Sequence, residues 1–323
     1  MTSPLHLVTG AAGFVGRRLA AALSARGARV VAVDDLADPA KRGRLEGLGL
    51  VDALDRRELA DRLAHGRFDL PLGGVFHQGA TADTLSRDPA QLYRNNLRFS
   101  LALCDHALAR RIPFVYASSA AVYGAAGSFA RRPRSERPLN LYARTKLALD
   151  HAVRRRFPCA TSPLVGLRYF NVYGPGEDHK GRMASMVHRA HRQLTETGVL
   201  RLFAGGHGLA DGEQRRDFVH VDDVVAVNLF FAERPTARGL FDVGSGRSRS
   251  FNELARLLIA RLGRGRVVYV PIPTQVAGRY QTFTQADLRA LRRAGYARPF
   301  LSLEEGLART FGPPEATGAQ AVA

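Results

Sequence analysis

Residues 8–16 of the chain read Val-Thr-Gly-Ala-Ala-Gly-Phe-Val-Gly, a GxxGxxG pattern that links a short apolar stretch to the alanine- and leucine-rich stretch Phe14–Ala25. This order predicts a strand, a glycine turn and a helix. Gly10 would permit the tight turn, Gly13 would let the backbone approach a pyrophosphate, and Gly16 would allow close packing of the helix on the strand. A pyrophosphate in the turn would face the partial positive charge of the helix N-terminus. The stretch therefore predicts a dinucleotide site.

The alternation of strands and helices continues along the chain. We predict strands at Leu5–Thr9, Arg29–Val33, Gly74–His77, Pro113–Ala117 and Pro163–Tyr169, and helices at Phe14–Ala25, Gln91–Arg110 and Tyr142–Arg156. Neighbouring parallel strands need crossover connections, which helices usually supply. The predicted fold is therefore α/β: a Rossmann-type doubly wound parallel sheet with a smaller C-terminal α/β substrate domain.

The pattern changes after about Gly174, where Pro- and Gly-rich loops surround a helix near Met183–Thr197. Short strands are expected at Phe218–Val221, Leu240–Val243 and Val267–Val270. We expect a nucleotide-binding domain at 1–172, with about 218–243 returning to it, a substrate domain at 173–217 and 244–311, and a disordered tail at 312–323.

Composition narrows the class of protein. The chain has 323 residues, 46% hydrophobic and 24% charged, which is ordinary for a globular protein. Cys104 and Cys159 are far apart and lack a CxxC pattern, so we expect buried thiols, with neither a disulfide framework nor a metal site. No apolar run is long enough for a membrane span, and the arginines that follow the first apolar stretch reverse the order of a secretory signal. These features predict a cytoplasmic protein with no membrane partner.

The formal charge of +18 raises the alternative of a nucleic-acid-binding protein. The arginines are scattered rather than gathered in one arm or on one helix face, so we expect no nucleic-acid partner. Only three of the 47 basic residues are lysines, namely Lys41, Lys146 and Lys180. Because a lysine, unlike an arginine, can lose a proton when its pKa is shifted, these three are candidates for chemistry.

Two acidic residues, Asp34 and Asp35, end the second predicted strand. A carboxylate at this place accepts hydrogen bonds from the adenosine ribose and ordinarily favours NAD. Lys41 lies a few residues further on and could reach a 2′-phosphate. NADP and NAD therefore both stay open from the residues alone.

A candidate catalytic group follows the strand Pro113–Ala117. Ser119 comes at the carboxyl edge of the sheet, where open α/β sheets bind ligands. Tyr142 and Lys146 are four residues apart, so on a helix they share one face. A phenol with its usual pKa of about 10 is a poor base, but nearby positive charge favours the phenolate. Tyr142 could then exchange a proton with a substrate hydroxyl while a nicotinamide cofactor carries the electrons.

These residues together resemble the extended short-chain dehydrogenase/reductase superfamily, which includes the NAD-dependent epimerases and dehydratases. Further stretches resemble, within it, the ADP-L-glycero-D-manno-heptose 6-epimerase family. They are FVYASSAA (114–121), RYFNVYGP (168–175), HKG (179–181), MAS (183–185), RDFV (216–219) and GRYQTFTQADL (278–288).

The resemblance implies epimerisation at C6″ of an ADP-heptose for the lipopolysaccharide core, with NADP as cofactor, NAD being possible, and a homo-oligomer, often a pentamer. It assigns acid/base roles to Tyr142 and Lys180, with Ser119 and Lys146 assisting. The implied cofactor contacts, beside Gly10, Gly13 and Gly16, are Phe14, Val15, Asp34, Asp35, Lys41, Gln78, Gly79, Ala80, Thr81, Asn95, Tyr142, Lys146 and Val172. The candidate substrate contacts are Ser119, Asn171, Arg182, Arg189, Phe203, Arg216 and Tyr280.

Two alternatives stay open. The first is another nucleotide-sugar 4-epimerase or 4,6-dehydratase of the same superfamily. A 4-epimerase can turn its keto-sugar over and use one tyrosine, so it would not need Lys180. The second is a non-catalytic NADP-sensing or nucleic-acid-binding protein, which would need neither Tyr142 nor Lys146.

Overall fold

The structure is a computed structural model that describes residues 3–84, 86, 88–124, 135–206, 208–273 and 280–313. These residues form two compact units. The first unit is drawn from Met1–Tyr169, Val221–Val243 and Asp287–Arg298, and the second from Phe170–His220, Gly244–Ala286 and Pro299–Ala323.

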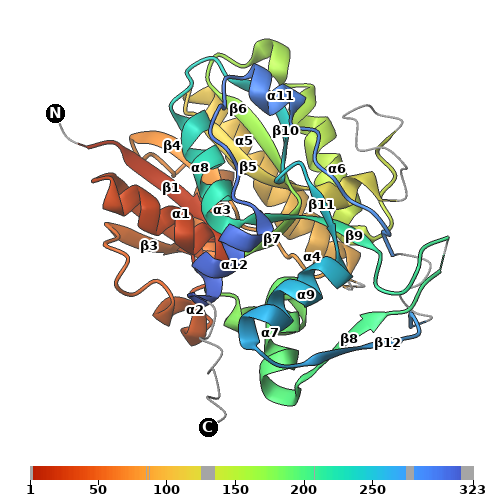
Figure 1. The fold of residues 1–323 in the computed structure, drawn as a ribbon. Helices are drawn as coiled ribbons and strands as arrows, with labels where there is room; N and C mark the ends of the chain where they lie inside the picture. Colours follow the sequence, from red (N-terminus) through yellow and green to blue (C-terminus); the bar gives the residue numbers. More distant parts are fainter. Residues whose placement is uncertain are drawn as a thin grey trace, which may run out of the picture. The chain divides into compact units, whose positions relative to one another are not determined.

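The first unit is built on a seven-stranded parallel sheet (Figure 1). Its strands are β1 (Leu5–Thr9), β2 (Arg29–Asp34), β3 (Asp52–Asp55), β4 (Leu72–His77), β5 (Phe114–Ser119), β6 (Leu164–Tyr169) and β10 (Arg238–Val243). Their order in the sheet is β10-β6-β5-β4-β1-β2-β3. The chain therefore changes direction between β1 and β4, where a doubly wound sheet binds its nucleotide. The predicted Rossmann-type fold is confirmed.

Helices cover both faces of this sheet (Figure 1). On one face α1 (Phe14–Ala25) packs against α8 (Val221–Ala232), and on the other α5 (Phe99–Ala109) packs against α3 (Arg56–Ala64) and α6 (Leu141–Arg154). The central strands consist almost wholly of buried residues, because a sheet covered on both faces offers no solvent-facing side. The short helices α2 (Pro39–Gly43), α4 (Pro89–Tyr93) and α11 (Arg289–Arg293) complete the unit.

The helix expected at Gln91–Arg110 is interrupted. The chain forms α4, then a π-helical segment at Arg94–Arg98, and then α5. The wider π turn carries Asn95 and Asn96, and such turns often occur at functional sites. The apolar periodicity of the sequence does not distinguish this segment from a regular helix.

The second unit has two small sheets and its own core. β7 (Asn171–Tyr173), β9 (Arg215–His220) and β11 (Ser248–Ser250) form one sheet, and β8 (Val199–Phe203) and β12 (Arg266–Val270) form the other. The helices α7 (Met186–Thr197) and α9 (Phe251–Leu262) pack together over a leucine-rich core, and α12 (Leu303–Phe311) packs on β9. Ser250 with Glu253, and Ser302 with Glu305, form complete capping boxes at the starts of α9 and α12.

Some details of the fold differ from the sequence prediction. Segment 287–298 belongs to the first unit, a placement that the sequence did not indicate. Cys104 is buried as expected, but Cys159 is exposed, because it lies in a short surface turn at Phe157–Cys159. Both thiols are free. Of the predicted tail 312–323, residues 314–323 lie outside the described residues.

Candidate active site

The glycine turn after β1 has the geometry that its sequence predicts. Gly10 has φ +67°, and a Cβ there would lie 2.6 Å from the backbone nitrogen of Gly79. A Cβ on Gly16 would lie 2.1 Å from the carbonyl oxygen of Gly10. Both positions therefore require glycine, one for its backbone angle and the other for the close approach of α1 to the turn.

We expect Gly16→Ala to lower the unfolding temperature and the amount of nicotinamide cofactor that stays with the purified chain. The added methyl group forces the turn and α1 apart, which should cost about 1–3 kcal/mol of unfolding free energy. Thermal unfolding and the absorbance of released cofactor measure the two effects. Gly206→Ala is the matched control for an added methyl group, because nothing lies within 4 Å of a Cβ there and the residue is exposed, with a φ that other residues adopt. An unchanged unfolding temperature in Gly16→Ala would contradict the crowded geometry.

The first turn of α1 is suited to an anion. Its N-cap, Gly13, offers no side-chain hydrogen bond, and the first turn holds no acidic residue. A Cβ on Gly13 would approach the Gly10 carbonyl to 3.1 Å. A pyrophosphate can accept hydrogen bonds from the backbone N–H groups at a helix start, and Phe14 and Val15 begin the helix at this point.

The acidic pair at the end of β2 is partly engaged within the chain. The Asp34 carboxylate is buried and accepts hydrogen bonds from the Ala12 nitrogen (2.9 Å), the Asp35 nitrogen (2.8 Å) and the Lys41 ammonium (2.8 Å). In the part of the chain that the structure describes, the buried Oδ1 of Asp35 has no hydrogen-bond partner. A ribose hydroxyl would satisfy this oxygen, so the acidic pair with Lys41 fits the ribose end of a dinucleotide.

The remaining predicted cofactor residues follow β4. Thr81 accepts a hydrogen bond from the side chain of Asn95 (3.0 Å), and its backbone nitrogen donates to Asn96 (2.7 Å). Gln78 donates to Asn228 of α8 (3.0 Å) and accepts from Tyr169 (2.8 Å). Gly79 lies against the glycine turn and Ala80 is exposed, whereas Val172 is in β7 of the second unit.

Three supporting residues here were missed by the sequence reading. The buried His77 ring contacts the hydroxyls of Thr9 (2.6 Å) and Ser100 (2.7 Å), which holds the end of β4 beside β1. Burial and the nearby Lys146 charge lower the pKa of His77 to about 3, so its ring is neutral at ordinary pH. Asn96 and Asn228 are equally buried. Of the three residues, only Asn96 could have been noticed in the sequence, because it stands in the asparagine pair at 95–96.

The predicted catalytic residues of the first unit come together. Asn140 caps α6 by accepting a hydrogen bond from the Ala143 nitrogen (2.8 Å), which places Tyr142 in the first turn. The Ser119 side chain at the end of β5 is within hydrogen-bonding reach of the Tyr142 phenol. Lys146 is buried, with its ammonium 6.0 Å from the centre of the Tyr142 ring, and donates to the Ala117 carbonyl (2.8 Å).

The protonation of this group in the ligand-free chain is governed mainly by burial. Burial raises the pKa of Tyr142 in the ligand-free chain, although the bond with Ser119 acts in the other direction. Burial also lowers the pKa of Lys146 to about 8, while Asp150 acts to raise it. Lys146 alone therefore does not produce the phenolate, and a further positive charge has to arrive with the ligand.

A buried ion network lies behind the catalytic helix. The fully buried Arg168 of β6 donates to Asp150 of α6 (2.8 Å) and to Glu136 (2.6 Å). Asp150 also accepts a hydrogen bond from Tyr116 of β5 (2.9 Å). The network therefore fastens α6 to the two strands whose ends carry the site. The residues of this network are far apart in the sequence, so no local sequence pattern predicts the network.

In the second unit, Arg216 lies in an aromatic setting. Its guanidinium is 5.0 Å from the centre of the Tyr280 ring and 5.4 Å from that of Phe251. Phe203 packs edge-on against Tyr280 (5.4 Å), and the charge of Arg189 acts on Tyr280. Burial lowers the pKa of Arg216, and among the described residues no carboxylate forms an ion pair with it. A buried cation without a counter-ion is suited to an anionic ligand.

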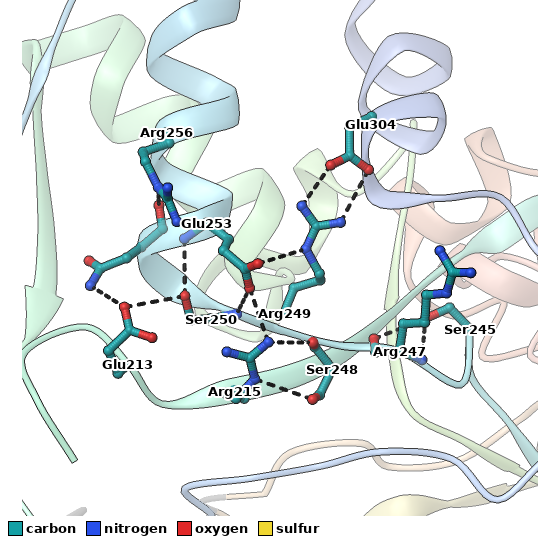
Figure 2. A network of polar contacts seen from close by, with 11 residues as sticks. Glu213, Arg215, Ser245, Arg247, Ser248, Arg249, Ser250, Glu253, Arg256 and Glu304 are labelled. Atoms are coloured by element: carbon teal, nitrogen blue, oxygen red, sulfur yellow. Dashed lines mark hydrogen bonds and ion pairs between the residues drawn. The ribbon is translucent and has the colours of Figure 1, made fainter.

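The neighbouring Arg215 of β9 is engaged within the chain, in the polar network that Figure 2 shows. It donates to the Ser248 carbonyl (2.8 Å) and pairs with Glu253 (3.3 Å). Arg249 joins the same network by pairing with Glu253 (3.4 Å) and Glu304 (2.6 Å). Because side chains alternate along a strand, two adjacent arginines have different tasks: Arg215 holds the strands together, and Arg216 is available to a ligand.

The other predicted substrate residues lie on β7 and on the turn before α7. Asn171 of β7 donates from its amide to the Asp217 carbonyl (3.2 Å) and to the Thr284 hydroxyl (3.1 Å). Lys180 and Arg182 lie in a 3₁₀ turn at Asp178–Met183, where Lys180 pairs with the buried Glu177 (2.7 Å). The sequence reading missed Glu177, although an acidic residue three positions before a lysine is a recognisable signal.

Within the described ranges, no three His, Cys, Asp or Glu side chains gather into a group that could hold a metal ion. No helix in these ranges combines the length and the apolar character that a membrane span requires.

The parallel sheet and the glycine turn define a nucleotide-binding α/β protein, and the Ser-Tyr-Lys group is a candidate acid/base site at the sheet edge. Residues 6–244 match the NAD dependent epimerase/dehydratase family, and the chain belongs to that family. Its members typically use a nicotinamide dinucleotide as cofactor.

Similar proteins include the ADP-L-glycero-D-manno-heptose-6-epimerase of Alkalilimnicola ehrlichii, 45% identical over 302 residues, which are 93% of this chain and 94% of the relative. The solved structure of the Helicobacter pylori enzyme of that name is 30% identical with a TM-score of 0.81, over 95% of this chain and 94% of that one. The Thermus thermophilus UDP-glucose 4-epimerase, solved with NAD, is 26% identical with a TM-score of 0.77, over 95% and 97%.

Proposed function

We propose that the chain is an ADP-glyceromanno-heptose 6-epimerase, which inverts C6″ of ADP-D-glycero-D-manno-heptose for the lipopolysaccharide core. The observation that supports this most is the Ser119, Tyr142 and Lys146 group in a chain 45% identical, over 93% of its length, to a relative of that name.

The chemistry explains why an epimerase needs a redox cofactor. Removing the C–H proton from an unactivated carbinol carbon is unfavourable because that proton is barely acidic. Oxidation to a ketone avoids this step, since the flat ketone can be reduced again from its other face. A bound nicotinamide supplies the reversible two-electron acceptor for C6″ and, in its oxidised form, a positive charge beside the phenol.

Tyr142 then acts on the C6″ oxygen. As phenolate it accepts the hydroxyl proton while C6″ is oxidised, and Ser119 donates a hydrogen bond to the same oxygen. Lys146 adds a positive charge 6.0 Å from the ring centre, which favours the phenolate. Lys180 of the second unit supplies the acid/base group for the other face of the keto intermediate.

The ADP portion carries two phosphates, and the second unit offers cations for them. Arg216 is buried beside Tyr280 and Phe251, and Arg189 acts on the same tyrosine. We assign these residues, with Phe203 and Asn171, to the nucleotide, and Arg182 to the diphosphate. An aromatic-lined guanidinium binds both the negative charge and the flat groups of a nucleotide.

For the cofactor we propose NADP rather than NAD. Lys41 neutralises the Asp34 carboxylate, and Lys41, Arg42 and Arg44 are the neighbouring cations that a 2′-phosphate would bind. We expect Lys41→Met to raise the dissociation constant of NADPH about tenfold, which is the effect of losing one charge-assisted hydrogen bond. The constant for NADH should change little.

Fluorescence titration of the cofactor-stripped chain measures these constants without turnover. Arg62→Met, which removes one positive charge from the exposed ion pair with Glu58 in α3, is the matched control. Equal effects of Lys41→Met on both cofactors would contradict the assignment of Lys41 to the 2′-phosphate.

The decisive experiment for the function uses the purified chain as it is. It is incubated with ADP-D-glycero-D-manno-heptose carrying deuterium at C6″, with no added cofactor, and the sugar is followed by NMR. We expect conversion to the L-glycero form with the deuterium retained. Loss of the deuterium to water, or no conversion by a chain that holds cofactor, would refute the proposal.

The same incubation with UDP-sugars tests the superfamily alternative, since a 4-epimerase or 4,6-dehydratase would convert those instead.

The proposal also includes a cytoplasmic homo-oligomer, as the resemblance implies. Sedimentation equilibrium measures its size.

A further inference from the structure

A fully buried carboxylate is paired with Lys180. Glu177 has no exposed surface, whereas 22% of the Lys180 side chain is exposed. The Lys180 ammonium donates to Glu177 Oε2 over 2.7 Å. Taking a carboxylate out of water costs several kcal/mol, which only good partners offset. The burial of Glu177 therefore depends on the groups that it binds.

Glu177 also binds the start of α7. The Ser185 nitrogen donates to Oε2 and the Ser185 hydroxyl to Oε1, each over 2.7 Å. Ser185 is the N-cap of α7, and its hydroxyl accepts from the His188 nitrogen (3.1 Å). α7 in turn buries Val187, Ala190 and Leu194 in the core of the second unit. Glu177 thus connects Lys180 to a firmly packed helix.

The backbone around Lys180 is fixed as well. Its nitrogen donates to the Glu177 carbonyl over 2.9 Å. The next residue, Gly181, has φ +51° and ψ −124°, a conformation that favours glycine, and its carbonyl accepts from the Ala184 nitrogen (3.1 Å). Lys180 is therefore held through both its backbone and its side chain.

We propose that Glu177 is a positioning residue that holds Lys180 in place as an ammonium ion, ready to donate a proton to the keto intermediate. This rests on the proposed function, in which Lys180 serves the second face of the sugar. While C6″ is reduced, the ammonium gives its proton to the ketone oxygen, and the neutral amine stays beside Glu177. Before the next turnover the Tyr142 phenol gives up to water the proton that it took from the substrate hydroxyl, and the Lys180 amine regains one from water, so no net proton is consumed.

The charges around this pair agree with that role. On the same turn lie Asp178, His179 and Arg182, and the Asp178 carboxylate is 3.7 Å from His188 of α7. The Glu177 carboxylate contacts the ammonium directly, and Glu177→Gln removes this ion pair.

The test compares Glu177→Gln with Ser185→Ala in the full-length enzyme. Glu177→Gln keeps the shape of the side chain but removes its charge, so Lys180 loses its ion pair and is displaced. A small displacement of an acid/base group lowers kcat by about 10². We expect this loss with an unchanged KM for the nucleotide sugar. Ser185→Ala removes a hydrogen bond to the same carboxylate and the cap of α7, so its unfolding temperature should fall. It leaves the ion pair, so its kcat should stay near that of the wild type.

A second pair of variants separates this inference from the function itself. Lys180→Ala should lower kcat by about 10²–10⁴, and adding Glu177→Gln to it should lower kcat no further. A fully active Lys180→Ala enzyme would refute the proposed role of Lys180. A severe loss in Lys180→Ala, with wild-type kcat in Glu177→Gln or with a further loss in the double variant, would overturn the positioning role alone.

Retained cofactor and the unfolding temperature show whether each variant is folded. Should Glu177→Gln be unfolded at the assay temperature, Glu177→Asp replaces it. Aspartate keeps the buried charge, but it is one methylene too short to hold both Lys180 and Ser185. The same loss of kcat is expected, and an undiminished kcat would overturn the proposal.

Discussion

Tyr142→Phe should lower the epimerase kcat by about 10³, within the range of about 10²–10⁴ that a positioned acid/base group contributes. The substitution removes one oxygen atom and nothing else. It leaves Lys146 bonded to the Ala117 carbonyl and leaves Asn140 as the cap of α6. The KM for the nucleotide sugar should change little, because the ring remains in place. Conversion of ADP-D-glycero-D-manno-heptose followed by NMR measures the effect.

Tyr93→Phe is the control for this variant. Tyr93 ends α4 and is 41% exposed, so the loss of its hydroxyl should leave kcat and the unfolding temperature unchanged. Cofactor content should be the same in the wild type and both variants. If Tyr142→Phe keeps more than about a tenth of the wild-type kcat, Tyr142 is not the proton-transferring group.

The sheet and the catalytic helix could be predicted because their signals are local. The glycine spacing at 10–16 requires a strand-to-helix turn, and the structure has α1 at Phe14–Ala25, as predicted. Tyr142 and Lys146 share a face simply because they are four residues apart on a helix. The position of Asp34 in the site could also be predicted, because it stands at the end of the second strand.

The parts that the sequence did not reveal depend on contacts between distant segments. The partners of Arg168 lie 18 and 32 residues away along the chain, and Asn228 reaches Gln78 across 150 residues. A buried arginine and an exposed one look alike in a sequence, as Arg216 and Arg215 show. The exposure of Cys159 could not be predicted for a related reason: it depends on where the turn that carries this residue lies in the folded chain.

The second large effect concerns stability. Arg168→Met should lower the unfolding free energy by about 3–5 kcal/mol, which is the usual result of removing one partner from a buried ion pair. The Arg168 side chain has no exposed surface, and neither has that of Asp150. Without the guanidinium, the Asp150 carboxylate keeps a hydrogen bond from Tyr116 and the electrostatic attraction of Lys146, but it loses its ion-pair partner. Urea unfolding followed by circular dichroism measures the difference.

Arg154→Met is the matched control, because Arg154 contacts the same Glu136 oxygen as Arg168 does. The Arg154 side chain is 34% exposed, so its loss should cost only about 0–1 kcal/mol. Similar costs for the two variants would contradict the view that burial makes the Arg168 pair indispensable.

A double variant identifies the cause of the loss. Adding Asp150→Asn to Arg168→Met removes the orphaned carboxylate, so the double variant should be more stable than Arg168→Met alone.

The pH dependence of stability, through Glu136, offers a second check. It is buried, but hydrogen bonds from Arg154, Arg168 and His151 lower its pKa to about 2. A lowered carboxylate pKa gives stability that is present above the unfolded pKa of 4.5 and is lost as the pH falls towards 2. Arg168→Met should therefore lose less stability than the wild type between these pH values, because one of the bonds that lowers this pKa is gone. An equal loss in both proteins would mean that Arg154 and His151 alone hold Glu136 in its charged form.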